Sequence, residues 1–527
     1  MTLASLIILV TPAIPLGIPG EWTWARRAVS DIDPNALLGS LVLAVAYWFW
    51  ACARERKIAH FAWTGQGDPR RVSQFETWLI ASHCVAAFIW MGGMLCIQPE
   101  FQGLARSPAV LYYKRTEGYF HQAAFEVQDS REFLSGYRDS IASGDNPDRY
   151  LHLGTHPPGL TLAYRVLLVG FEHYPQVAEA LIAIEPSRFR EGIEGLRQFP
   201  TPRDQPLSAA EEATLWAGTL LTLLAVAGAC WPIYRLTLRM SDRVTAWRAA
   251  ALWPLVPSLF VFFPKSDLLC PVLALTSCWL WLDGWSRLRW GRCVLAGAGF
   301  FVGLLLTLAL APVALLLVIQ TGLERWIRRE EFRSRRVRED VATVLAAVVG
   351  FLVPLFALSV WGRCNLFAIW MQNLSNHALF YTHNPRSFGA WLVVNPLEAA
   401  FALGMPVACL VVGGVMRAVR QRLVSPLAFS QTVAWGVVWA ILWFSGKNMG
   451  EAGRLWIFLA PWPVMTAALG LLPKRNIGGD SSSPAEFMEE LDQSRAWRLF
   501  LILQLIACLW TTFAVDGFHF ADLLIAR

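Results

Sequence analysis

Two carboxylates in the polar segment 98–208 have the residue type and the setting that acid–base chemistry requires. Glu117 and Asp129 follow shortly after an apolar stretch that ends at Ile97, and Tyr119 lies between them. A carboxylate at a membrane surface is partly desolvated, which raises its pKa and suits it to remove a proton from a hydroxyl group. The same residues also fit an exposed amphipathic helix with ordinary charges. Glu117 and Asp129 are therefore candidate catalytic residues.

A pair of histidines forms a second group. His152 and His156 belong to the run His-Leu-Gly-Thr-His-Pro-Pro-Gly, which leads directly into the apolar stretch 159–171. The paired prolines favour an extended approach and then a helix start, so His156 should stand at the head of a helix whose dipole attracts anions. A phosphate group would fit there. Alternatively, the prolines only seat a helix that is too short to cross a bilayer and suited to its interface.

Charged residues also occur in two short turns between apolar stretches. Lys265 and Asp267 lie in one turn, and Glu451 and Arg454 lie in the other. Charges beside a bilayer are costly unless they bind a ligand or pair with each other. Binding of a phosphate is one explanation. For Glu451 and Arg454, which are close in sequence, a helix-end ion pair is the other.

A polar and aromatic segment, 362–396, completes the set of candidates. It contains His377 and Arg386 together with several aromatic residues. Such a mixture is suited to holding a phosphate and a sugar ring, and it is equally typical of an interfacial belt. Within it, Asn373-Leu374-Ser375 matches the glycosylation triplet, which is common in sequences of all kinds.

The elements that must position these residues are membrane helices. Of the 527 residues, 55% are hydrophobic and only 16% are charged, a composition that excludes a set of soluble domains. The scattered cysteines form no CxxC pair and indicate neither a zinc site nor a disulfide framework. We predict an all-α polytopic protein with about 12 to 13 transmembrane helices. The predicted spans are residues 2–19, 37–53, 78–97, 209–236, 248–263, 266–284, 293–308, 309–321, 341–361, 397–416, 427–446, 455–472 and 498–517.

Basic residues orient these spans, because cytoplasmic loops retain Lys and Arg. More than half of the 45 Lys and Arg residues fall in alternate loops, which we assign to the cytoplasm. All the candidate residues then lie on the non-cytoplasmic side. The first span, which contains two prolines, is alternatively a shallow helix that does not cross. The run 293–321 has basic flanks on both sides, so we expect a hairpin of two partly sunken helices that turns near 308–312.

We divide the chain into three parts. Residues 1–77 form N-terminal membrane helices and a basic cytoplasmic loop. Residues 78–208 form a leading helix and a large non-cytoplasmic first loop, which carries interfacial helices and the candidate catalytic residues. Residues 209–527 form the remaining transmembrane bundle.

The order of these motifs resembles that of the GT-C superfamily of integral membrane glycosyltransferases, in particular its ArnT and protein-mannosyltransferase-like and bacterial mannosyltransferase-like branches. The resemblance begins near residue 78. One departure concerns the family's acidic pair: no Asp-Glu or Asp-Asp directly follows the leading helix, and Glu117-Gly118-Tyr119 is the nearest equivalent. The motifs that carry the resemblance are the acidic-aromatic patch 117–120, the His-Pro-Pro turn 156–159, the turn 264–267, the Gly-rich apolar hairpin from 297, and Gly-Glu-x-x-Arg-x-Trp at 450–456.

The resemblance implies a transferase that moves a sugar from a polyprenyl-phosphate-linked donor to an acceptor hydroxyl on the external face. It implies that Asp129 or Glu117 is the general base of an inverting step and that His156 positions donor or acceptor. The other candidates would bind substrate, with the basic ones at the lipid phosphate: Tyr119, His152, Lys265, Asp267, His377, Arg386, Glu451 and Arg454.

The partners expected from this resemblance are a lipid-phosphate-linked sugar donor and membrane lipids, without nucleic acid. A divalent metal is compatible with the chemistry, although no recognisable motif encodes a metal site. The expected location is a bacterial inner membrane, with multiple passes. The alternative function is a transporter or flippase for a lipid-linked or polar solute, which would more often show ionisable residues in mid-span and repeat symmetry between halves.

Overall fold

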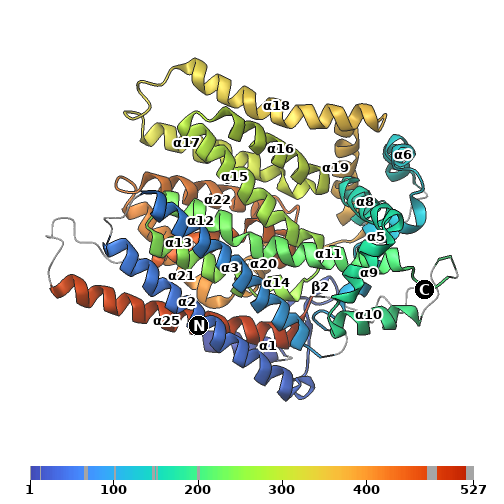
Figure 1. The fold of residues 1–527 in the computed structure, drawn as a ribbon, viewed down its shortest axis with the longest axis horizontal. Coiled ribbons are helices and arrows are strands. Elements are labelled where there is room, and N and C mark those ends of the chain that lie inside the picture. The colour runs from blue at the N-terminus through green and yellow to red at the C-terminus, as the bar shows by residue number, and fades with distance from the viewer. Residues whose placement is uncertain are drawn as a thin grey trace.

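The computed structural model describes residues 2–11, 13–64, 69–99, 102–144, 149, 152–198, 202–203, 205–471 and 484–517. Helices dominate this part of the chain, and the long ones run side by side in one bundle (Figure 1). Their bounds are α2 (Pro34–Thr64), α3 (Pro69–Ile97), α11 (Ala209–Gly228), α12 (Cys230–Met240), α13 (Arg243–Leu252), α15 (Cys270–Arg287), α16 (Trp290–Leu306), α17 (Ala311–Ile327), α18 (Val337–Trp361), α19 (Leu366–His383), α20 (Phe388–Leu403), α21 (Met405–Arg420), α22 (Pro426–Phe444), α24 (Pro461–Gly470) and α25 (Pro484–Ala514).

Nine helical segments are long and apolar enough to cross a membrane within the described residues, or ten if the bent pair α20 and α21 counts as one span. The protein is therefore an all-α, multi-pass membrane protein, as the composition predicts. Each of the thirteen predicted spans overlaps a helix at least partly. The count of crossing segments is lower because several of these helices are too short to cross a membrane. Residue 472, the last of the predicted span 455–472, lies outside the described residues.

Two apolar helices that are too short to count as spans still run from one end of the bundle to the other. Helix α16, about 25 Å long, has Arg292 in its first turn and ends at Leu306, which lines a cavity with His156. The short helical segment Ile457–Gly470 begins next to Leu455, which lines a second cavity, and the carbonyl of Leu471 accepts a hydrogen bond from Arg248 at the other end. The predicted hairpin 293–321 is present and turns at η5 (Leu308–Leu310).

Two expectations for these spans need correction. Helix α17 extends to Ile327, and the segment Leu308–Ile327 is long enough to cross completely, so the second arm of the hairpin is longer than the sequence suggested. The first predicted span, 2–19, contains only the nine-residue helix α1 (Thr2–Val10). The chain then turns at Gly17, whose φ of +133° only glycine adopts readily, and enters a β-hairpin.

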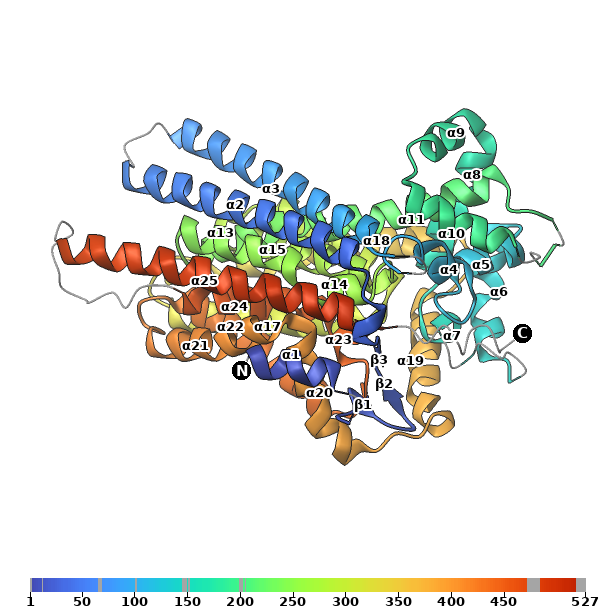
Figure 2. The same ribbon diagram turned by 90° about the horizontal axis from the view of Figure 1, so that it is seen from below.

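Short helices of the segment 98–208 gather at one end of the bundle, and α19 stands beside them (Figure 2). The opposite end is formed by α2, α3 and α25, which extend furthest from this group. The short helices are α4 (Ser107–Tyr112), α5 (Tyr119–His121), η2 (Gln122–Glu126), α6 (Ser130–Ala142), α7 (His152–Thr155), α8 (Gly159–His173), α9 (Pro175–Ala183) and α10 (Ser187–Arg197). Helix α8 coincides with the predicted helix 159–171.

The remaining elements are short and connect or brace the long helices. Strand β1 pairs with β2, and β3 pairs with β4, so the N-terminal segment is joined to the end of α25. The bounds of these elements are β1 (Gly17–Ile18), β2 (Trp22–Thr23), β3 (Ala25–Arg26), η1 (Val29–Asp31), η3 (Trp253–Leu255), α14 (Ser258–Val261), η4 (Ser266–Leu269), α23 (Ala452–Leu455), η6 (Ile457–Leu459) and β4 (Val515–Asp516).

Candidate functional site

A polar pocket with an empty volume of about 240 Å³, its open mouth included, lies where the short helices meet the bundle. Four segments that are distant in sequence supply its walls: the loop before α5, the turn α7, the turn before α15 and the short helix α23. Seven of the eleven candidate residues line it, and Ser266 and Leu455 complete the lining. The seven are Glu117, Tyr119, His152, His156, Lys265, Asp267 and Arg454.

Glu117 is the buried carboxylate of this pocket, with an exposed fraction of 2%. The next residue, Gly118, has φ +80°, a left-handed conformation that turns the chain at this point. Glu117 Oε1 accepts a hydrogen bond from the backbone amide of Ser266 at 2.5 Å, whereas Oε2 has no hydrogen-bond partner among the described residues. Burial raises the pKa of Glu117, and the nearby Lys265 ammonium offsets part of that rise. A carboxylate with a raised pKa and one unsatisfied oxygen can accept a proton near neutral pH.

Lys265 brings a buried cation to the same pocket. Its Nζ donates a hydrogen bond to the carbonyl of Thr116, the residue before Glu117, and its exposed fraction is 3%. Burial lowers the pKa of Lys265, with a further contribution from the positive charge of Arg454. The hydrogen bonds of Lys265 and Ser266 therefore clamp two turns together, so that Glu117 and Lys265 face one small space.

Arg106 fixes the turn that carries Lys265. Its guanidinium donates hydrogen bonds to the carbonyls of Phe260 and Val261, both at 2.8 Å, and forms an ion pair of 2.7 Å with Asp516. Asp516 also pairs with Arg27 at 2.8 Å. The sequence around Arg106 carries no sign of this role, because its partners are carbonyls and a carboxylate that only the tertiary fold brings near.

The two histidines flank the turn α7: His152 is its first residue, and His156 follows its last residue and donates its backbone amide to the carbonyl of His152. Nδ1 of His156 lies 3.0 Å from the carbonyl oxygen of His152, which can only accept, so Nδ1 carries the proton and Nε2 keeps its lone pair. Burial lowers the pKa of His156 to about 4 and holds that of His152 well below its ordinary value. Both imidazoles are therefore neutral at physiological pH and can exchange hydrogen bonds with hydroxyl groups.

Arg454 connects the pocket to a chain of ion pairs. It contacts Asp267 at 3.6 Å and Glu451 at 2.7 Å, and Glu451 also contacts Arg386 at 3.5 Å. Burial opposes ionisation of Glu451, but Arg454 and Arg386 outweigh it and lower the pKa of this carboxyl. The predicted pairing of Glu451 with Arg454 is thus present, and it extends to two further charges.

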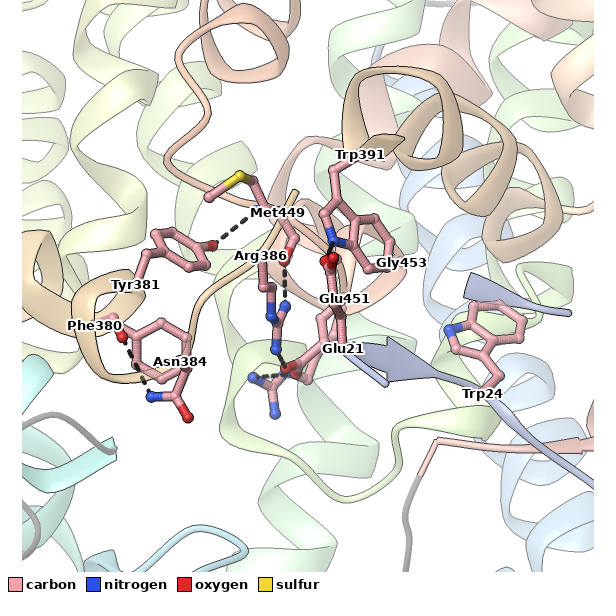
Figure 3. Close-up of polar contacts among 12 residues, drawn as sticks. Glu21, Trp24, Phe380, Tyr381, Asn384, Arg386, Trp391, Met449, Glu451 and Gly453 are labelled. Atoms are coloured by element: carbon pink, nitrogen blue, oxygen red, sulfur yellow. Dashed lines mark hydrogen bonds and ion pairs between the residues drawn. The ribbon is translucent and has the colours of Figure 1, made fainter. Parts of the chain in front are cut away.

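The N-terminal hairpin reaches the same network. Figure 3 shows Glu21 beside Trp391, close to Arg386 and Glu451. Glu21 accepts hydrogen bonds from Trp391 Nε1 at 2.6 Å and from the Ser387 hydroxyl at 2.5 Å. No local signal could have revealed this contact, because the two partners are separated by more than 360 residues.

The other candidate residues lie outside the lining of the pocket. Asp129 is exposed and caps α6, accepting hydrogen bonds from the amides of Arg131 and Glu132 at 2.8 and 2.7 Å. His377 is half-buried on α19, close enough that its positive form would lower the pKa of His156. Arg386 and Glu451 are joined to the pocket by the ion pairs that lead to Arg454, as described above.

A second, apolar cavity adjoins the polar pocket. His156, Ser266 and Asp267 line both, so the two spaces share one wall. The remaining lining residues of this cavity are Leu160, Leu269, Cys270, Leu306 and Thr307. A ligand with a polar head joined to an apolar part would match the two spaces, since one is polar and the other is apolar.

No group of three or more His, Cys, Asp or Glu side chains is placed to hold a metal ion in the described part of the chain. The polar chemistry of the pocket resides in two carboxylates, two neutral imidazoles, a tyrosine, an ammonium and a guanidinium. These groups can bind a phosphate, accept a proton and orient hydroxyl groups.

Comparisons with known proteins yield structural neighbours. No protein-family model and no curated protein matches the chain. The archaeal oligosaccharyltransferase AglB from Archaeoglobus fulgidus, solved with an inhibitory peptide and a dolichol-phosphate, is similar with a TM-score of 0.47 and 12% identity, covering 84% of this chain and 57% of its own. The apo form of the Archaeoglobus fulgidus oligosaccharyltransferase is similar with a TM-score of 0.48 and 12% identity, covering 84% and 56%.

A third structure of the Archaeoglobus fulgidus enzyme, tethered to an acceptor peptide, gives a TM-score of 0.43 at 12% identity and covers 85% of this chain and 56% of its own. This chain thus spans little more than half the length of these solved structures.

Proposed function

We propose that the protein is a membrane glycosyltransferase that transfers a sugar from a lipid-phosphate-linked donor to an acceptor hydroxyl on the non-cytoplasmic face. One observation carries the proposal: the buried carboxylate Glu117, with one unsatisfied oxygen and a raised pKa, shares a pocket with Lys265, Arg454 and two neutral histidines. A general base beside cationic groups matches the demands of displacement at a phosphorylated sugar carbon.

In the proposed step, the acceptor hydroxyl attacks the anomeric carbon of the donor. The new carbon–oxygen bond forms as the bond between that carbon and the phosphate oxygen breaks, and the lipid phosphate leaves with the electron pair. Glu117 Oε2 takes the proton of the hydroxyl. Attack from the face opposite the leaving phosphate inverts the configuration of the sugar carbon.

Lys265 and Arg454 are the proposed phosphate ligands. Arg454 is oriented by Glu451 and Asp267, so little side-chain freedom is lost when it binds an anion. The apolar cavity beyond His156 and Asp267 would receive the first part of the lipid chain. His156, His152 and Tyr119 remain to bind hydroxyl groups of the sugar or the acceptor.

The test is a transfer assay in vesicles with labelled polyprenyl-phosphate sugars. Replacing Glu117 by Gln keeps the size of the side chain but removes the base, so transfer should fall by about 10²- to 10⁴-fold. Replacing Asp129 by Asn provides the matched comparison, because Asn also caps helices well and Asp129 lies outside the pocket. This second variant should keep most of the activity.

Two results would contradict the proposal. Full activity in the Glu117→Gln variant would remove Glu117 from the chemistry. Absence of transfer with every labelled donor, together with measurable uptake of a solute or lipid-linked sugar, would favour the transporter or flippase instead.

A further inference from the structure

We propose that Asn373 of α19 is a positioning residue for the turn α7, and that it sets the place of the His156 imidazole in the pocket. The inference rests on the proposed function, since it assigns Asn373 a role in the same reaction. It explains a residue that the sequence marks only as part of a glycosylation triplet.

The turn α7 cannot hold its own position. It is a four-residue helix, which is far below the length at which a helix is stable alone. Pro157 and Pro158 follow it, and proline has no backbone N–H to donate. The turn nevertheless begins with His152 and leads directly into His156, so neighbouring elements must fix its backbone.

Asn373 supplies the most direct of these contacts. Its Nδ2 donates hydrogen bonds to the carbonyl of Gly154 at 3.0 Å and to the carbonyl of His156 at 2.9 Å. One amide group therefore bridges the middle and the end of the turn. The side chain has an exposed fraction of 0%, so water does not compete for these two bonds.

Two further side chains support the same backbone. The hydroxyl of Tyr137 on α6 lies 2.8 Å from the carbonyl of Leu153 and 2.9 Å from that of His156. Nδ2 of Asn376, one helical turn after Asn373, donates to the carbonyl of Gly154 at 3.0 Å. Helices α6 and α19 thus hold α7 between them through polar contacts.

The backbone position of α7 determines the position of the imidazole. His156 donates from Nδ1 to the carbonyl of His152 in the same turn, so the ring is fixed relative to that turn. Moving the turn therefore moves Nε2, the atom that is left to bind a substrate hydroxyl. Asn373 acts on the reaction through this turn without lining the pocket itself.

Two observations show that Asn373 is not a simple packing residue. Its Oδ1 is buried without a hydrogen-bond partner among the described residues, a cost that an aliphatic residue of similar size would avoid. Its amide nitrogen, the atom that glycosylation modifies, is engaged in two hydrogen bonds inside the fold. Asn373 of the triplet at 373–375 therefore bonds to other parts of the same chain, and it is inaccessible to a modifying enzyme in the folded protein.

The experiment compares Asn373→Asp with Asn365→Asp in the full-length protein. Asn373→Asp keeps the shape of the side chain but replaces the donor by an oxygen that faces two carbonyls. Asn365 caps the same helix by accepting from the amide of Ala368 at 3.1 Å, and Asp caps equally well. The chemical change is thus the same at both positions, and only the first affects α7.

Two readouts are measured. The first is transfer, where Asn373→Asp should lower kcat by about 10- to 100-fold and change the donor KM little, because phosphate binding is left intact. The second is modification of His156 by diethylpyrocarbonate, followed by mass spectrometry across a pH series. Loosening of the turn and the added negative charge should both raise the apparent pKa of His156 from about 4 towards its ordinary value, and Tyr137→Phe, which adds no charge, isolates the effect of loosening. Asn365→Asp should change neither readout.

Wild-type transfer and a wild-type modification profile in Asn373→Asp would overturn the inference. If Asn373→Asp does not fold, Tyr137→Phe removes the other donor to the carbonyl of His156 and should shift both readouts in the same direction. An unchanged His156 profile in that variant would be equally decisive. If the wild-type protein transfers no sugar, the proposed function fails, while the modification profile still decides whether Asn373 positions His156.

Discussion

Arginine–carboxylate pairs occur at both ends of the bundle, but only the pocket end also holds a buried carboxylate and a buried ammonium bonded to backbone groups within the described residues. At the end assigned to the cytoplasm, carboxylates meet arginines directly: Glu55 accepts two hydrogen bonds from Arg248, at 2.7 and 2.5 Å, and Glu324 pairs with Arg239 at 3.4 Å. At the pocket end, Glu117 bonds to a backbone amide and Lys265 to a backbone carbonyl.

This difference separates structural charges from charges available for chemistry. A carboxylate bonded directly to a guanidinium forms an ion pair in which the two buried charges neutralise each other. Glu117 instead bonds to one backbone amide and lines the pocket, and burial raises its pKa, so its protonation can change near neutral pH where a substrate can reach it. The pocket therefore concentrates the reactive groups, while the other end concentrates the groups that stabilise the bundle.

The largest expected effect tests the structural end. Arg248→Met leaves Glu55 buried without its partner, which should lower the free energy of unfolding by about 3–5 kcal/mol. Transfer per folded molecule should remain near the wild-type value, because the pair lies far from the pocket end. Denaturant unfolding in detergent measures the first quantity. A stability equal to that of the wild type would show that charges at the two ends do not differ in this way.

The next effect is the pH dependence of transfer. The base must be ionised, so the rate should rise with pH through the pKa of Glu117, about tenfold per pH unit below it. Since burial raises this pKa, the rise should lie above the ordinary range of glutamate. The rate should fall again as Lys265, whose pKa burial lowers, loses its proton.

Lys265→Arg is the control for that profile. Arginine stays protonated at all accessible pH values, so the falling limb should move to higher pH while the rising limb stays in place. A falling limb that is unchanged in this variant would assign it to another group.

A smaller effect is expected at Gly118. Gly118→Ala places a Cβ at φ +80° and 2.8 Å from the carbonyl of Lys114, which should cost about 1–2 kcal/mol and displace Glu117. Gly136→Ala is the matched control, because Gly136 lies inside α6 with nothing near its Cβ position. That change should stabilise the protein by about 0.5–1 kcal/mol. Equal thermal shifts for the two variants would argue against the strained turn.

The smallest effect concerns the histidines. The folded protein holds His156 neutral down to a pKa of about 4, whereas the unfolded chain binds a proton near pH 6.5. Its contribution to stability is therefore complete above about pH 6.5 and is lost as the pH falls towards 4. His156→Gln should flatten this part of the melting-temperature profile. An unaltered slope would mean that other groups dominate the acid response.

Several site residues were predictable because their chemistry is local. Glu117 and His156 stand out as polar residues beside apolar stretches, and Lys265 and Asp267 mark a short turn between two spans. Asp129 has the same local signature as Glu117, yet it caps a helix in solvent. Residue type and spacing could not separate the two carboxylates, because their difference in burial depends on the turn at 262–266, which is distant in sequence.

The amino-acid sequence by itself determined that the chain is a multi-pass helical membrane protein with its polar chemistry in the segments assigned to one face. Hydropathy and the distribution of basic residues are properties of each segment alone, so they can be read without a fold. Only the tertiary structure decided which polar groups meet. Ser266 bonds to Glu117, Asn373 bridges the turn of His156, and Glu21 reaches Trp391. Each of these contacts joins segments more than 140 residues apart, at distances that only packing of the helices sets.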